Sequence, residues 1–184
     1  MQILPVFADL LGTDETGYGY LLSAGGLGSV VGTLLIGSAQ ESRRLGMIML
    51  AGAAGSVFLL FAFAWTSTTG NFPLAVGLVF LAAASASFYM IISMTVMQLL
   101  VPDALRGRVM GIHTIGYSLV PLGGLFLGAL ADSYGASQAI VVGGCIYLVA
   151  IAVTSLAKRN LREIDGRALQ SNEAESDQVG LAAR

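Results

Sequence analysis

Polar side chains that could contact a small molecule lie inside apolar stretches of the sequence. Three of them, Ser85, Tyr89 and Ser93, recur at every fourth position and would share one face of a helix, with Met97 one step further. Hydroxyl groups donate and accept hydrogen bonds, and methionine offers an apolar surface that adapts to different shapes. The stripe could therefore contact an amphipathic molecule. The alternative is that the hydroxyls bond to backbone carbonyls or to a neighbouring helix.

A second polar group follows in a later apolar stretch. His113 precedes Tyr117 by four residues and Ser118 by five, so the three would lie close together on a helix. Histidine titrates near neutral pH, and an ionisable group inside a membrane is a functional candidate by default. The alternative is that His113, which lies near Arg108, touches headgroups or water. No acidic residue lies deep in an apolar stretch, so His113 is the candidate titrating group.

The stretches that carry these residues are long enough to cross a membrane. Hydrophobic residues make up 55% of the 184 residues, charged residues make up 11%, and the mean hydropathy is +0.79, unlike a water-soluble domain. Backbone groups in lipid must be paired within their own segment, and strict apolar/polar alternation is missing, so helices are predicted rather than a β-barrel. The predicted fold class is an all-α integral membrane protein, a polytopic bundle with five spans: Gly17–Ala39, Leu45–Trp65, Leu74–Leu100, Val109–Ala131 and Ala139–Ala157.

The basic residues predict how the five helices are oriented. Successive connections alternate between the two faces of the membrane, and every second connection is basic: Arg43 and Arg44, then Arg106 and Arg108, then Lys158, Arg159 and Arg162. The other face receives Asp9, Asp14, Glu15 and Asp132 and has no Lys or Arg. The positive-inside rule makes the basic face cytoplasmic. We therefore expect a multi-pass protein of the plasma membrane, in a bacterium the inner membrane, with its C-terminus in the cytoplasm.

Polar segments flank the predicted bundle, which covers residues 17–157. Residues 158–184 are polar and acidic, and we expect them to form a disordered cytoplasmic tail. The first residues carry no basic segment, and Asp9 interrupts the apolar run, so a cleavable signal peptide is not expected. The single cysteine, Cys145, lies in an apolar stretch and is interpreted as a packing residue. No metal site and no cofactor are expected.

Small residues and one proline predict how the helices pack and bend. Pro121 removes an intrahelical hydrogen bond near the middle of the fourth span, where Gly123 and Gly124 allow bending. The three residues are predicted to form a hinge, with a static kink as the alternative. Three glycine pairs have the four-residue spacing that lets helices approach closely in lipid: Gly28 and Gly32, Gly107 and Gly111, Gly124 and Gly128.

Three segments resemble the major facilitator superfamily of transporters. LPVFADLLGTDETGYGYLLSAGGLGSVVG, residues 4–32, is similar to the end of helix seven, the outer loop and helix eight of that family. VPDALRGRVMG, residues 101–111, resembles the cytoplasmic loop between helices ten and eleven, and GALADSYG, residues 128–135, resembles the outer turn before helix twelve. The Pro, acid, Arg-Gly-Arg order resembles a branch containing enterobactin-type siderophore exporters and macrolide-type efflux proteins. The resemblance implies a C-terminal half, with residues 1–16 as the end of a truncated helix seven and an outer loop.

The resemblance also implies a function, which is secondary-active efflux of small amphipathic compounds such as drugs or siderophores. In the resembled fold helix ten lines the central cavity and helix eleven flanks it, so substrate-cavity positions are expected at Ser85, Tyr89, Ser93, Met97, Tyr117 and Ser118. The arginines of the cytoplasmic loops, Arg43, Arg44, Arg106 and Arg108, are expected to help close a gate against the other half. The expected partners are the lipid bilayer, the missing N-terminal half and a small-molecule substrate. Without that half, the chain is not expected to transport.

Other classes of protein fit the sequence less well. An intramembrane enzyme is not expected, because H-E-x-x-H, G-x-S-x-G and paired intramembrane acids are all missing from the sequence. No surface for nucleic acid is suggested. An accessory or structural membrane subunit without transport activity stays as the alternative, because it needs only helices that pack in lipid.

Overall fold

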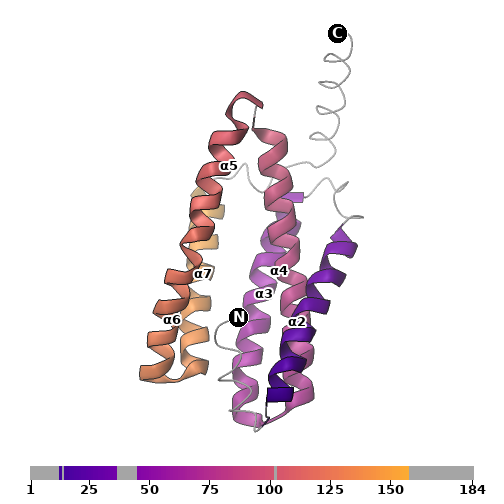
Figure 1. Cartoon of the computed structure of the whole chain (residues 1–184), viewed down its shortest axis with the longest axis vertical. Coiled ribbons are helices and arrows are strands. Elements are labelled where there is room, and N and C mark those ends of the chain that lie inside the picture. Colours follow the sequence, from indigo (N-terminus) through magenta and orange to yellow (C-terminus); the bar gives the residue numbers. More distant parts are fainter. Residues whose placement is uncertain (1–12, 14, 37–44, 102, 158–184) are drawn as a thin grey trace.

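The computed structural model describes residues 13, 15–36, 45–101 and 103–157, and its regular elements in those ranges are all α-helices (Figure 1). Five stretches are long and apolar enough to cross a membrane, and one of them combines two helices. The predicted all-α polytopic membrane fold is therefore confirmed. The helices are α2 (Glu15–Ile36), α3 (Leu45–Thr69), α4 (Phe72–Leu100), α5 (Asp103–Ser118), α6 (Val120–Tyr134) and α7 (Ala136–Ala157).

The connections between helices are tighter than the sequence predicted. Only Gly70 and Asn71 lie between α3 and α4, and Gly135 alone separates α6 from α7. Both glycines have positive φ angles, 61° and 94°, which a residue without a Cβ adopts at little cost. The Asn71 side chain accepts a hydrogen bond of 3.2 Å from the backbone N–H of Leu74 and so caps α4. Most residues predicted to form outer turns therefore belong to helix ends.

The fourth span is not the single helix Val109–Ala131 that the sequence predicted. It consists of α5 and α6, with a break at Leu119. Pro121 has no N–H to donate to the carbonyl of Tyr117, one turn earlier. The N–H groups of Leu122 and Gly123 both donate to the Leu119 carbonyl, at 3.0 and 3.3 Å, and so restart the helix from that residue.

The start of the fourth span also differs from the prediction. Helix α5 begins at Asp103, so Arg106 and Arg108 lie in its first turns rather than in a loop. The physical reason is that alanine, leucine and arginine all favour helices, and here they directly follow the residue that opens the helix. The connection between α4 and α5 is reduced to residues 101–102.

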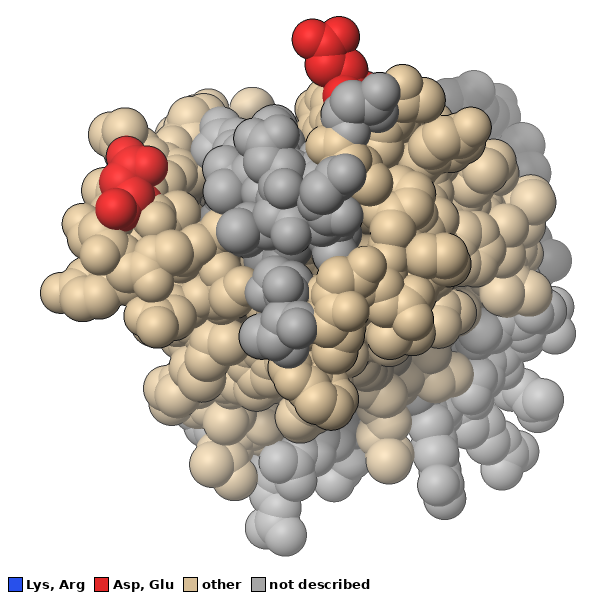
Figure 2. Space-filling model, turned by 90° about the horizontal axis from the view of Figure 1, so that it is seen from below, with Lys and Arg blue, Asp and Glu red and all other residues tan. Residues whose placement is uncertain are grey.

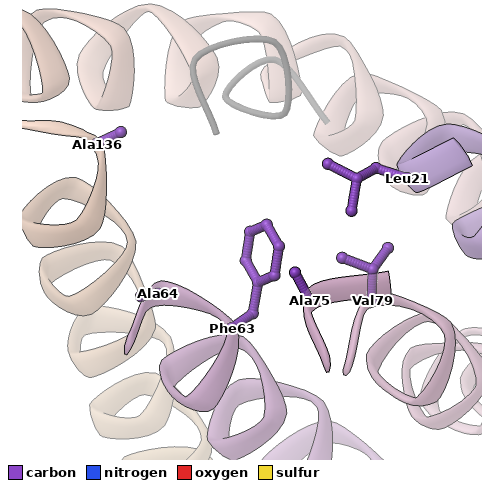
Figure 3. Close-up of a cluster of buried hydrophobic side chains, with 6 residues drawn as sticks. All are labelled: Leu21, Phe63, Ala64, Ala75, Val79 and Ala136. Carbon is purple, nitrogen blue, oxygen red and sulfur yellow. The ribbon is translucent and has the colours of Figure 1, made fainter. Parts of the chain in front are cut away.

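Helix α4 lies between α2 and α3 and packs against both, whereas α7 packs against α3 and α6 (Figure 1). One buried cluster joins α2, α3, α4 and α7 near the end where α3 turns into α4 (Figure 3): Leu21, Phe63, Ala64, Ala75, Val79 and Ala136. A second cluster joins α2, α3 and α4 toward their opposite ends: Ile36, Leu45, Met49, Ile92 and Val96. Packed side chains thus hold α2, α3 and α4 together along most of their length.

Glycines of α2 and α3 allow the backbones of these helices to lie directly against the backbone of α4. A Cβ added at Gly32 of α2 would lie 2.5 Å from the carbonyl oxygen of Ala84, and one at Gly28 would overlap the Phe80 carbonyl. A Cβ at Gly52 of α3 would lie 2.9 Å from the carbonyl oxygen of Ser85. The close contact predicted for the Gly28 and Gly32 pair is therefore confirmed, and α3 uses the same device.

Three glycines of the other two pairs do not mediate helix packing among the described residues. A Cβ at Gly107, Gly111 or Gly128 would meet no atom within 4 Å, so the predicted contacts of these residues are wrong. The reason is that spacing places small residues on one helix face, but it does not supply a neighbouring helix to cover that face. Over the whole fourth span, no residue of its most apolar window is buried.

Candidate functional site

The polar stripe of α4 faces α3 and α7. A Cβ at Gly55 of α3 would lie 4.0 Å from Ser85 Oγ. The ring of Tyr89 meets that of Tyr147 of α7 edge to face, with centroids 6.4 Å apart and an interplanar angle of 89°. By contrast, α2 packs against a different face of α4, which includes Ala84. The structure therefore places Ser85 on the side of α4 that faces α3, and Tyr89 against Tyr147 of α7.

The hydroxyls of this stripe differ from the other serine of α4. Ser87 donates to its own helix at the Ala83 carbonyl, at 3.0 Å, and across to the Ser29 carbonyl of α2, at 3.4 Å. No described residue forms a hydrogen bond with the side chain of Ser85 or Ser93, and no described side-chain oxygen is both buried and unpartnered. The two hydroxyls are therefore accessible, whereas Ser87 fills the packing role. Met97, the last residue of the stripe, is half-buried.

The polar group of α5 forms a pair of its own. The rings of His113 and Tyr117 lie 5.0 Å apart at 70°, and Tyr117 is 48% exposed. Ser118 donates to the Thr114 carbonyl of its own helix at 3.2 Å, the role that hydroxyls commonly take in membrane helices. Helix α5 is not among the close partners of α4. The structure thus joins His113 to Tyr117 but leaves both on a different helix from the stripe.

The break in the fourth span separates a helix that is packed from one that is not. Helix α6 packs against α7, where a Cβ at Gly143 would lie 2.9 Å from the Leu127 side chain. A Cβ at Gly123 meets no atom within 4 Å, and Gly124 is partly buried. The bend at Pro121 is thus present, and its movement as a hinge stays a prediction.

Charged residues lie at the two ends of the bundle. Arg106 donates from Nη2 to the carbonyl of Gln98, in the last turn of α4, at 3.3 Å, and Arg108 is exposed nearby on α5. The opposite end shows acidic side chains and no Lys or Arg among the described residues in view (Figure 2). Glu15 opens α2 at that end, and Asp132 lies in the last turn of α6. Arg43 and Arg44 lie outside the described residues, as do residues 1–12 and the predicted tail.

Tyr147 is the residue that sequence reasoning missed. It lies near the middle of α7, and its partner Tyr89 was already a candidate. A signal was available, because tyrosine in membrane proteins prefers the interface with water. A tyrosine in the middle of an apolar run is therefore unusual enough to be a candidate on its own.

Comparison with known proteins gives one finding. A family model for the Major Facilitator Superfamily matches residues 1–179, which is nearly all of the 184 residues. Searches of curated proteins and of solved structures returned no match. The matched residues include all six described helices and the five stretches that can cross a membrane. The chain therefore belongs to the Major Facilitator Superfamily.

Proposed function

We propose that this chain is the C-terminal part of a secondary-active transporter that exports small amphipathic compounds, such as drugs or siderophores. Members of the superfamily are transporters rather than enzymes. The Arg-Gly-Arg segment that begins at Arg106 supports the exporter branch, because it resembles the loop of siderophore and macrolide efflux proteins. The five spans correspond in this proposal to helices eight to twelve.

The observation that carries the proposal is the break in an uncovered span. Pro121 leaves the Tyr117 carbonyl without its intrahelical donor near the middle of the span. An unpaired carbonyl is costly in hydrocarbon, so broken helices occur where protein or a water-filled cavity covers them. No residue in the most apolar window of this span is buried within the chain. A cavity shared with an N-terminal half would supply both the cover and the water.

The charges support an orientation for the proposed transporter. Arg106 and Arg108 lie at one end of the bundle, and Glu15 and Asp132 lie at the other. We propose that the arginine end faces the cytoplasm of a bacterial cell and takes part in closing the transporter on that side. Arg106 already holds the start of α5 to the last turn of α4. Release of this contact would free α5 to move about the break at Leu119.

His113 is the group that we propose for exchange of protons with the cavity. The described carboxylates, Glu15 and Asp132, both lie at helix ends. His113 lies farther inside the membrane, with the ring of Tyr117 against it. Imidazole can both donate and accept a proton, which suits coupling to a proton gradient. Further coupling carboxylates would belong to the other half of the transporter.

Accumulation of labelled compounds in cells tests the proposal. Cells that express the complete transporter gene should accumulate less of an amphipathic drug or siderophore than cells without it, and a protonophore should abolish the difference. His113→Gln should weaken export about tenfold or more if imidazole carries the proton, while Thr114→Ala, a neighbouring control whose hydroxyl bonds to its own helix, should leave it unchanged. Equal accumulation across a broad panel of compounds would instead favour an accessory membrane subunit.

A further inference from the structure

The six tyrosines of the chain divide into two groups by depth. Tyr18 and Tyr20 lie in the first turns of α2, and Tyr134 is the last residue of α6. These three lie at the acidic end of the bundle, where tyrosine belongs, because its ring is apolar and its hydroxyl needs water. Tyr147 lies 11 residues from the start of α7, about 16 Å into the helix. Tyr89 lies similarly deep in α4, as does Tyr117 in the broken span.

Two of the deep tyrosines meet each other across different helices. Tyr89 and Tyr147 are each 37% exposed, and their rings are in edge contact at 6.4 Å. Neither hydroxyl forms a hydrogen bond with a residue that the structure describes. Ser85, one turn before Tyr89 on the same face, also presents an accessible hydroxyl. Hydrogen-bonding groups from α4 and α7 therefore converge beside an aromatic surface.

Phe61 of α3 contacts α7 one helical turn before Tyr147. Phe61 packs so closely against Gly144 of α7 that an added Cβ would overlap its ring. Gly144 precedes Tyr147 by one helical turn, so Phe61 and Tyr147 lie on neighbouring parts of the same seam. Phe61 also meets Phe58, which is 61% exposed, with ring centroids 6.3 Å apart. An aromatic side chain of α3 therefore lies along α7 one turn before the tyrosine pair.

Packing alone does not explain why these two residues are tyrosines. Phenylalanine would provide the same ring contact without a hydroxyl, and a hydroxyl without a partner is costly in hydrocarbon. The cost is removed when a bound molecule accepts the hydrogen bonds. Aromatic rings also bind flat rings in stacked or edge-on geometry. Both properties of the pair therefore fit a ligand that is flat, aromatic and able to accept a hydrogen bond.

We infer that Tyr89 and Tyr147, with Phe61 one turn away along α7, form a binding site for aromatic compounds that carry a hydrogen-bond acceptor, such as aryl ketones. The inference rests on the proposed export function and names the class of compound that this seam takes. The phenol hydroxyls donate to the acceptor, and the rings hold the aromatic part of the ligand. The ligand enters from the side of the helices, where both tyrosines are exposed.

Photolabelling with benzophenone tests the site directly. Benzophenone is an aryl ketone that reacts with nearby C–H bonds under ultraviolet light, so the same molecule serves as ligand and label. The full chain in lipid nanodiscs should show saturable labelling, with the modified peptides in α4 and α7. Tyr147→Phe should raise the half-saturating concentration about two- to tenfold, the effect of one lost hydrogen bond, and the double variant with Tyr89→Phe should raise it further.

A matched control separates the site from general partitioning into lipid. Tyr134→Phe makes the same chemical change at the end of α6, where Tyr134 is 68% exposed, and should leave labelling unchanged. Non-saturable labelling, or equal labelling of all variants, would overturn the site and leave the proposed export untouched. If labelling is saturable but the accumulation experiment shows no export, the export function is rejected and the binding site is retained. A normal far-ultraviolet circular dichroism spectrum for Tyr147→Phe shows that any lost binding is not lost folding.

Discussion

Helix α4 and the broken span formed by α5 and α6 are both apolar and rich in small residues, yet they are packed very differently. Helix α4 is enclosed by α2 and α3, and glycines of both neighbours touch its backbone. Helix α5 has α6 as its main neighbour, and α6 has α7. In α4, 22% of the most apolar window is buried, whereas none of the window that spans α5 and α6 is buried.

This difference shows what glycine does in a membrane protein. In lipid, apolar surface gains little by moving onto another apolar helix, so association depends on close packing. Gly28 supplies that packing because α4 lies against it. Gly111 also has a glycine four residues away, Gly107, but it faces open space. Glycine in an uncovered span is therefore available for bending, or for a partner that the chain does not contain.

Substitution of single glycines should give the largest contrast between the two regions. Gly28→Ala places a methyl group against the Phe80 carbonyl, and backbone gives way less easily than a side chain. We expect a loss of about 1–3 kcal/mol in unfolding free energy, as for overpacked cores. Gly111→Ala should be neutral or stabilising by up to about 1 kcal/mol, because alanine favours helix and no atom is in its way.

Unfolding in mixed micelles, titrated with sodium dodecyl sulfate and followed by circular dichroism, measures both variants. Gly116→Ala, at a second open glycine, is the matched control and should behave like Gly111→Ala. Equal losses at all three positions would mean that the broken span is as tightly packed as α4, and the comparison would fail.

Replacement of Pro121 should change the unfolding free energy less than Gly28→Ala does, and it should raise stability rather than lower it. Pro121→Ala restores an N–H that can donate to the Tyr117 carbonyl, which should stabilise the span by about 0.5–1.5 kcal/mol. The span should also become stiffer. Spin labels on Ile112→Cys of α5 and Val149→Cys of α7, both exposed positions, in a Cys145→Ala background should report a narrower distance distribution.

The spin-label pair needs the proline-containing chain as its reference. A distribution of unchanged width would show that the bend is static rather than a hinge. Leu122→Ala, at an exposed neighbouring position, controls for the loss of side-chain volume and should leave the width unchanged. Lower stability in Pro121→Ala would mean that other contacts have adapted to the bend.

The sequence predicted helices well because their physical requirement is local. Length and hydropathy suffice to identify spans, and Pro121 marked the place where the fourth span breaks. The predicted ends of the helices were less accurate, because Gly70 and Gly135 allow turns with almost no loop. The contact of Tyr89 with Tyr147 joins residues of different helices, and single-helix spacing does not reveal which helices become neighbours.

The smallest effect should come from the contact that links the two regions. Arg106 donates to the Gln98 carbonyl at the C-terminal end of α4, where a positive charge also interacts favourably with the helix dipole. Arg106→Gln should cost roughly 0.3–1 kcal/mol at low salt in the same micelle titration. High salt should shrink this loss, because the contact is exposed and ions screen it. Arg108→Gln removes the same charge two residues away and should cost less. An equal, salt-dependent loss in both variants would mean that net positive charge, rather than the bond to Gln98, connects the packed helices to the open span.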